Sequence, residues 1–260
     1  MSFAKPLSKS AKVMANIAIS NLAWEADNDE QIYKLMNSLQ VRFLEISPFR
    51  ESSALDEISY KQAHNLKRKL KKYDIQTIAL QALLFRHPEL IIFKDEATRK
   101  KTLNHLVKIM DFANEIGAKT MILGSPKNKL RGKKTYKKAF DIAVIFFQQL
   151  AQKSKEHELT ICLETTPVLY GADFTRNSNE TIAMVKAINH PAFKFNFDRG
   201  AMMTNKEEIT EVIPPNAQLL DHVHISEPYL RPLHYDPIFD CALAKTLKAI
   251  HYKGFISVEM

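Results

Sequence analysis

Apolar and polar positions follow two alternating patterns along most of the chain. Short apolar runs rich in β-branched and aromatic residues are typical of buried strands. The longer segments between them carry apolar residues every three or four positions, which is typical of amphipathic helices. Capping residues, glycine and proline separate the two kinds of segment. The pattern therefore predicts a chain in which strands and helices alternate.

Eight strands and seven intervening helices are predicted. The strands are residues 16–20, 41–46, 75–80, 119–123, 159–164, 193–197, 219–225 and 255–258. The helices are residues 28–39, 53–73, 95–116, 133–157, 177–189, 207–213 and 239–251. Unbroken alternation predicts a parallel sheet, and eight units in 260 residues favour a closed (β/α)₈ TIM barrel, an α/β fold. No Gly-x-Gly-x-x-Gly motif follows the first strand, which argues against a dinucleotide-binding domain.

The barrel is expected to occupy most of the chain. We predict a single barrel domain over residues 16–260, preceded by a basic, loosely ordered leader over residues 1–15. The leader lacks the apolar core of a secretory signal. No helix is predicted after the last strand, so the eighth helix is expected to be missing or truncated. The leader, a neighbouring subunit or residues outside this sequence would then cover the groove between the eighth and first strands.

The amino-acid composition indicates which kinds of partner, such as membranes or nucleic acids, the protein is expected to lack. Apolar residues make up 45% and charged residues 25%, and no apolar run reaches the length of about 18 residues of a membrane-spanning helix. The formal net charge is +8, but the lysines are spread widely, so we interpret most of this charge as solvated surface. Cys162 and Cys241 lie in apolar patterns and are expected to be reduced and buried. We therefore expect a cytoplasmic protein with no nucleic-acid or membrane partner, and consider a homodimer.

Four predicted strands carry, at or near their ends, a side chain that binds metal ions in other proteins. These residues are Glu164, Asp198, His224 and Glu259. A carboxylate at the end of an apolar strand is unfavourable unless a metal ion, a proton or a partner satisfies it. In a barrel the carboxyl ends of all strands meet at the face that carries the active site. Three carboxylates and one imidazole predict a centre for Mn²⁺, Mg²⁺, Co²⁺ or Zn²⁺.

Taken singly, each of these residues also fits a structural role. Glu164 fits an ion pair, Asp198 a turn, His224 a hydrogen-bonded core position and Glu259 a chain end. Their shared place at the ends of strands five to eight favours the metal centre. His222 faces the same side of its strand as His224, because side chains alternate along a strand.

The order and spacing of the four residues carry a resemblance to a known family. They lie 34, 26 and 35 positions apart, which resembles the metal set of the xylose isomerase-like superfamily of TIM barrels. That superfamily includes ketose 3-epimerases, related dehydratases and AP endonuclease family 2 proteins. Residues 124–128, 170–174, 222–228 and 257–260 are similar to an uncharacterised subgroup of sugar phosphate isomerase/epimerase-like proteins. The resemblance covers residues 17–259 and implies that the four side chains bind a divalent metal ion.

The sequence departs from the epimerase pattern after Asp198. The epimerases carry a substrate-binding histidine three residues beyond this aspartate, where the present chain has Ala201. Their substrate-binding arginine corresponds to Arg231. Endonuclease IV requires further histidines for three zinc ions, but Gln81 and residues 124–126 stand where two of them are expected. The nuclease activity is therefore excluded.

The resemblance implies an enzyme that isomerises or epimerises a small sugar, sugar phosphate or polyol-like substrate through an enediolate. Glu164 and Glu259 would be the catalytic base and acid, while Asp198 and His224 would mainly hold the metal ion. Two alternatives stay open. One is a metal-dependent dehydratase of a cyclic polyol or keto acid, and the other is a non-catalytic, sugar-binding barrel.

Five residues are candidates for contact with the substrate, namely Trp24, Lys127, His222, Glu227 and Arg231. Lys127 would face a phosphate, and Gly124 would permit a close approach of the backbone. Trp24 would form an apolar wall under a sugar ring. A solvated loop role fits Lys127, Glu227 and Arg231 equally well, and a packing role at the rim fits Trp24.

Overall fold

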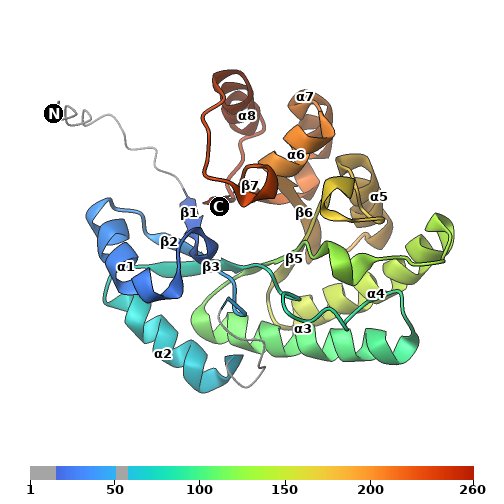
Figure 1. Cartoon of the computed structure of the whole chain (residues 1–260), viewed down its shortest axis with the longest axis horizontal. Coiled ribbons are helices and arrows are strands. Elements are labelled where there is room, and N and C mark those ends of the chain that lie inside the picture. Colours follow the sequence, from blue (N-terminus) through green and yellow to red (C-terminus); the bar gives the residue numbers. More distant parts are fainter. Residues whose placement is uncertain (1–15, 51–57) are drawn as a thin grey trace.

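The computed structural model describes residues 16–50 and 58–260 and contains a closed barrel of parallel strands (Figure 1). The strands follow one another around the barrel in chain order. They are β1 (Ile17–Ser20), β2 (Phe43–Ile46), β3 (Gln76–Leu80), β4 (Thr120–Leu123), β5 (Thr160–Glu164), β6 (Phe193–Asp198), β7 (Leu220–Ile225) and β8 (Phe255–Val258). The predicted (β/α)₈ barrel is confirmed. The predicted leader, residues 1–15, lies outside the described residues.

Helices fill the connections between successive strands. They are α1 (Asp29–Ser38), α2 (Tyr60–Lys71), α3 (Glu96–Ile116), α4 (Tyr136–Glu156), α5 (Ser178–Ile188), α6 (Arg199–Asn205), α7 (Ile209–Val212) and α8 (Pro237–Ala249). Several begin at the capping residue that the sequence suggests: the side chain of Asp95 accepts a hydrogen bond from the Thr98 N–H, and that of Asn177 accepts one from the Glu180 N–H. Gly117 ends α3 in a left-handed conformation, as expected of a C-terminal glycine.

Two helix predictions are corrected. The helix predicted from residue 53 begins only at Tyr60, because Ser59 caps it; residues 53–57 lie outside the described residues. Helix α6 was missed entirely. It starts directly at the end of β6, where the Asp198 side chain caps it by accepting a hydrogen bond from the Ala201 N–H at 2.6 Å. A helix of seven residues with no loop before it has too little periodicity to be recognised in the sequence.

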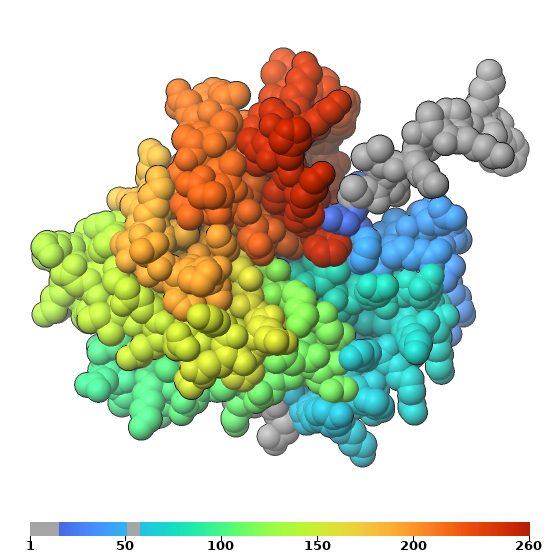
Figure 2. Space-filling view, turned by 180° about the vertical axis from the view of Figure 1, so that it is seen from behind, coloured from blue at the N-terminus to red at the C-terminus, as the bar shows by residue number. Residues whose placement is uncertain are grey.

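The two ends of the described chain close the barrel together. β8 pairs in parallel with β1, with Ile256 opposite Ile17 and Ser257 opposite Ala18. Figures 1 and 2 accordingly show the C-terminal residues beside the first strand. No helix follows β8 in the described part of the chain, as the sequence predicts.

Apolar residues pack between the strands and the surrounding helices, whereas polar residues gather inside the barrel near the carboxyl ends of the strands. On the outside, Phe147 of α4 packs on Phe193 of β6 with ring centroids 5.3 Å apart. On the inside, Ser20, Asn196 and His224 have no exposed surface. Buried polar groups require partners, so this end of the barrel must be a network of interacting side chains.

The two cysteines differ in environment. Cys162 on β5 is buried, as predicted, but Cys241 is exposed, which corrects the prediction for that residue. Cys241 lies in the first half of α8 on the side that faces solvent, and its Sγ contacts the hydroxyl of Tyr235 at 3.8 Å. Among the helices of the described ranges, none is long and apolar enough to cross a membrane.

Candidate metal centre

The four residues at the strand ends converge at the carboxyl-terminal face of the barrel. Glu164 and Asp198 are the last residues of β5 and β6, His224 is the penultimate residue of β7, and Glu259 directly follows β8. One oxygen or nitrogen atom of each lies within 4.8 Å of the corresponding atoms of the other three. Residues that are far apart in the sequence therefore form one compact donor set.

His224 and Asp198 are held in place by different partners. His224 Nδ1 lies 2.9 Å from Glu164 Oε1 and 3.3 Å from Glu259 Oε2. Asp198 Oδ1 accepts from the Ala201 N–H, and Asp198 Oδ2 accepts from the Ser226 hydroxyl at 2.6 Å. Both oxygens of Asp198 are thus oriented before any ligand binds.

Glu164 occupies a space that only glycine leaves open. A Cβ atom at Gly124 on the neighbouring chain segment would clash with Glu164 Oε2. Asn196 donates its amide N–H to Glu164 Oε1 at 2.7 Å. The buried Lys129 ammonium donates to the main-chain oxygen of Glu164 at 3.3 Å and to the Thr175 hydroxyl at 3.0 Å. The position of Glu164 is therefore fixed at both its backbone and its carboxylate.

Negative charge is crowded at this centre. Burial, together with the negative charges of Glu164 and Glu259, raises the pKa of Asp198 to about 7. Burial also raises the pKa of Glu259. A divalent cation among the four side chains would remove this repulsion and satisfy the buried carboxylates. The donor set, its burial and its spacing fit such an ion.

Two cavities border the centre. The larger, of about 700 Å³, is enclosed by the loops after β3 and β4 and includes Phe85, Arg86 and Lys127 in its wall. The smaller, of about 340 Å³, is bordered by the loops after β5 and β7. Glu164 and Glu259 line both cavities. These two carboxylates therefore face the space that a small molecule would enter.

Two of the five predicted substrate contacts border a cavity. Lys127 lies exposed in the wall of the larger cavity. Glu227 lines the smaller cavity, although its Oε1 already accepts hydrogen bonds from Arg199 and from the His234 N–H.

The other three predicted contacts line neither of these cavities. Trp24 donates its indole N–H to Asp29 at 2.8 Å. Arg231 is exposed and its guanidinium stacks 5.6 Å from the ring centroid of Tyr229. His222 is buried beneath the metal centre.

Several residues of the network were not singled out from the sequence. Glu45 on β2 is a fully buried carboxylate that contacts both His222 and His224. A signal for it was present, because Glu45 interrupts an apolar strand in the same way as Glu164. Lys129 and Asn196 gave no comparable signal, since a lysine in a loop and an asparagine in a strand are ordinary.

Arg199 is another residue that the sequence did not reveal. Its side chain is only 1% exposed and forms ion pairs with Glu227 at 2.6 Å and Asp240 at 2.7 Å. Its guanidinium also donates to the main-chain oxygens of Ser226 and His234. Arg199 therefore ties the loop between β7 and α8 to the end of β6, next to Asp198.

Comparison with known proteins identifies related folds. A family model described as a xylose isomerase-like TIM barrel matches residues 34–260. A search of curated proteins gives no match. A D-psicose 3-epimerase from Clostridium cellulolyticum H10, crystallised with D-tagatose, has a similar structure, with a TM-score of 0.78 and 18% identity. The match covers 94% of this chain and 84% of the epimerase.

Two further solved structures are similar over nearly their whole length. A 3-keto-D-glucoside 4-epimerase from E. coli has a TM-score of 0.75 and 15% identity, covering 94% of this chain and 91% of that one. An AP endonuclease of family 2 from Brucella melitensis has a TM-score of 0.70 and 15% identity, covering 95% and 93%. At these identities the likeness concerns the fold.

The contact between Gly124 and Glu164 predicts the effect of a single methyl group. In Gly124→Ala the new Cβ displaces the Glu164 carboxylate, and we expect the affinity for a divalent ion to fall by at least about tenfold. Isothermal titration with Mn²⁺ measures this. Gly132→Ala is the control: Gly132 has a positive φ of 59° but open space around it, so this change costs about 1–2 kcal/mol of stability and leaves metal affinity unchanged. Equal affinities for both variants would contradict the prediction.

The buried ion pairs of Arg199 predict a large loss of stability. Arg199→Met leaves the partially buried Glu227 and Asp240 carboxylates unpaired, and we expect the free energy of unfolding to fall by about 3–5 kcal/mol. Chemical denaturation measures this change. The exposed pair of Lys137 with Asp141 provides a control, because Lys137→Met removes an ion pair at the surface and is expected to cost less than about 1 kcal/mol. Similar losses in the two variants would show that the burial of Arg199 is unimportant.

The raised pKa of Asp198 predicts a pH dependence for metal binding. Below pH of about 7 the ion must displace a proton from Asp198, so we expect the apparent affinity to fall by about tenfold per pH unit. In the metal-free protein, stability should decrease as the pH rises from about 4 to about 7, because the unfolded state releases this proton first. Titrations and thermal melts between pH 5 and pH 8 test both signs. An affinity that is flat over this range would contradict the assignment.

Proposed function

Since the chain belongs to the xylose isomerase-like TIM barrel family, we propose that it is a divalent-metal-dependent isomerase or epimerase of a small sugar, sugar phosphate or polyol-like substrate. One observation carries the proposal: four metal-competent side chains form a compact set at the carboxyl end of the barrel, and two of its carboxylates line an adjoining cavity of about 700 Å³. The similar structures of a D-psicose 3-epimerase and a 3-keto-D-glucoside 4-epimerase support a carbohydrate as the substrate.

The four side chains divide into two roles. Asp198 and His224 are locked by hydrogen bonds to Ser226, Ala201 and Glu45, so they serve to hold the ion. Glu164 and Glu259 line both cavities, whereas Asp198 borders only the smaller one, so the two glutamates are the ligands that would contact a substrate in the larger cavity. A bound Mn²⁺, Mg²⁺, Co²⁺ or Zn²⁺ would polarise a substrate carbonyl and so acidify the neighbouring C–H bond.

The two glutamates then exchange protons with the substrate. One takes the proton from the carbon next to the carbonyl, and the other returns a proton, either to the opposite face of that carbon or to the neighbouring carbon. The first outcome is an epimerisation. The second is an isomerisation, in which the hydroxyl proton of the deprotonated carbon also passes to the former carbonyl oxygen, so that the carbonyl group moves to that carbon. Burial raises the pKa of Glu259, which favours the protonated form that an acid requires.

The walls of the cavity select the substrate. Lys127 in the wall of the larger cavity would pair with an anionic group such as a phosphate. This chain has Ala201 where ketose 3-epimerases have a substrate-binding histidine, so other residues at the rim of the barrel must bind the substrate. We propose a small molecule rather than a nucleic acid as the substrate, because the histidines required for a trinuclear zinc site are missing from the sequence.

Hydrogen exchange tests the proton-transfer roles directly. When the metal-loaded protein is incubated with a panel of ketoses and ketose phosphates in D₂O, we expect deuterium to enter the carbon next to the carbonyl. Glu164→Gln and Glu259→Gln should each lower this exchange by about 10²–10⁴-fold. NMR and mass spectrometry measure the incorporation, and the exposed Glu156→Gln on α4 is the control.

Two results would contradict the proposed function. A wild-type protein that binds no divalent ion would exclude it. Loss of water from the substrate in place of simple exchange would indicate a dehydratase.

A further inference from the structure

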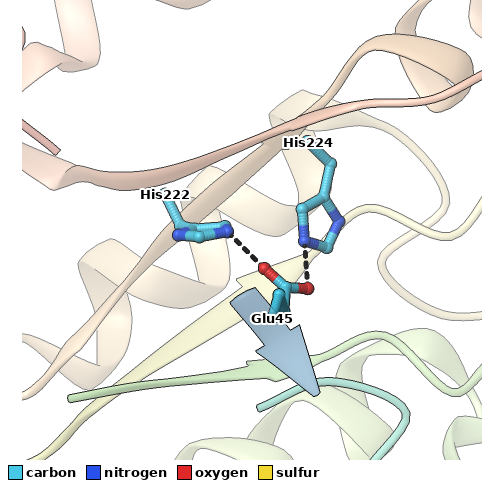
Figure 3. A group of neighbouring side chains, drawn as sticks. All are labelled: Glu45, His222 and His224. Atoms are coloured by element: carbon cyan, nitrogen blue, oxygen red, sulfur yellow. Dashed lines mark hydrogen bonds and ion pairs between the residues drawn. The ribbon is translucent and has the colours of Figure 1, made fainter. Parts of the chain in front are cut away.

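His224 presents its two ring nitrogens to different groups. Figure 3 shows the contact of His224 with Glu45. Nε2 lies 2.8 Å from Glu45 Oε1, while Nδ1 faces Glu164 Oε1 at 2.9 Å and Glu259 Oε2 at 3.3 Å. Glu45 and His224 have no exposed surface, so no bulk water replaces either partner. The imidazole is thus clamped between a carboxylate on one side and the candidate metal centre on the other.

The contact with Glu45 decides which nitrogen of His224 is able to bind a cation. An ionised carboxylate only accepts hydrogen bonds, so the nitrogen that faces it must carry the proton. In a neutral imidazole the other nitrogen then presents a lone pair. Nδ1 faces the carboxylates of Glu164 and Glu259, so without a cation it carries a proton as well, and a cation among Glu164, Asp198 and Glu259 would take the place of that proton while Glu45 keeps the one on Nε2. An imidazole nitrogen faces each of the two oxygens of Glu45, which is the arrangement of a carboxylate that accepts a hydrogen bond from both rings.

His222 holds Glu45 in turn. Its Nε2 lies 2.8 Å from Glu45 Oε2, so the two histidines occupy the two oxygens of one carboxylate (Figure 3). Their ring planes are 86° apart, with centroids separated by 5.1 Å. The carboxylate is unable to rotate without losing one of these bonds. The His222 side chain is only 1% exposed, so any group that took its place as the partner of Glu45 Oε2 would have to come from within the barrel.

We propose that Glu45 is a positioning residue that commits His224 to bind the metal ion through Nδ1, and that His222 acts on the centre through Glu45. Partners of this kind, one contact removed from the ion, commonly change metal affinity by about 10–100-fold when they are mutated. The inference rests on the proposed metal dependence. The competing assignment makes Glu45, His222 and His224 a second metal site, since their donor atoms are also close together. Positioning predicts one ion per chain, whereas a second site predicts two.

Glu45→Gln tests the role with almost no change of shape. The amide replaces one acceptor oxygen of Glu45 by an NH₂ group, which is itself a hydrogen-bond donor. The histidine that faces this NH₂ group can form a hydrogen bond with it only if its proton moves from Nε2 to Nδ1. We expect the affinity for Mn²⁺, measured by competition with a chelator, to fall by about 10–100-fold. Asp221→Asn is the matched control, because it removes a carboxylate from β7 itself, where Asp221 contacts Thr120 and Cys162 rather than His224. Its affinity should equal that of the wild type.

A pair of variants at His222 tests whether it acts through Glu45. His222→Met removes the donor to Glu45 and should weaken Mn²⁺ binding, whereas His222→Gln keeps an N–H donor and should restore part of the affinity. In a Glu45→Gln background, the additional effect of His222→Met should disappear. A loss that persists undiminished in that background would overturn the proposed order of action. If Glu45→Gln proves too unstable to titrate, the contrast between His222→Met and His222→Gln still tests the role of His222, because both variants leave Glu45 in place.

A measurement on the wild-type protein identifies the nitrogen itself. With ¹⁵N-labelled histidine and ¹¹³Cd²⁺, we expect the cadmium to couple to Nδ1 of His224, with the proton on Nε2, and one ion per chain. Coupling to Nε2, or two ions per chain, would overturn the inference while leaving the proposed function intact. A wild-type protein that binds neither Mn²⁺ nor Cd²⁺ would remove both. Unchanged Mn²⁺ affinity in Glu45→Gln would remove only the inference.

Discussion

Four carboxylates and two imidazoles share one end of the barrel, and their mutual charge governs the structure around them. Each buried charge requires a partner of opposite sign or several hydrogen bonds. The carboxylate of Glu45 pairs with the imidazoles of His222 and His224. That of Asp198 accepts hydrogen bonds from a hydroxyl group and a main-chain N–H. Glu164, Asp198 and Glu259 still repel one another, as the raised pKa of Asp198 shows. The divalent cation proposed above would offset this repulsion.

The same constraint explains features that otherwise look unrelated. Gly124 is required because the Glu164 carboxylate fills the volume of a side chain there. Helix α6 begins without a loop because its cap, Asp198, is also a member of the charged set. Arg199, the first residue of that helix, anchors the loop after β7 that borders the smaller cavity. The strand ends therefore fix the centre, and residues attached to them fix the walls around it.

Much of this could be predicted from the sequence because it depends on regular spacing. Alternating apolar runs gave the eight strands, and the barrel rule then brought Glu164, Asp198, His224 and Glu259 to one face. Contacts between side chains inside the barrel could not be predicted in this way, because they depend on how far each side chain lies from the ends of the strands. Glu45 and His222 lie far apart in the sequence, and only the closed barrel brings them into contact. The partners of Arg199 and Lys129 depend on loop paths for which the sequence has no periodic signal, and the exposure of Cys241 depends on the rotation of one short helix.

The pairing of β8 with β1 is the seam at which the barrel closes. Asn16, next to β1, donates a hydrogen bond to the main-chain oxygen of Lys253 across a separation of 237 residues. Contacts of such range form slowly, because the entropy of closing the loop opposes them until most of the chain is ordered. Glu259 joins the other ligands only when this seam is closed, so an ion held by all four side chains binds the closed barrel and not its open precursors. By mass action such an ion would stabilise the closed barrel relative to every state in which the seam between β8 and β1 is open.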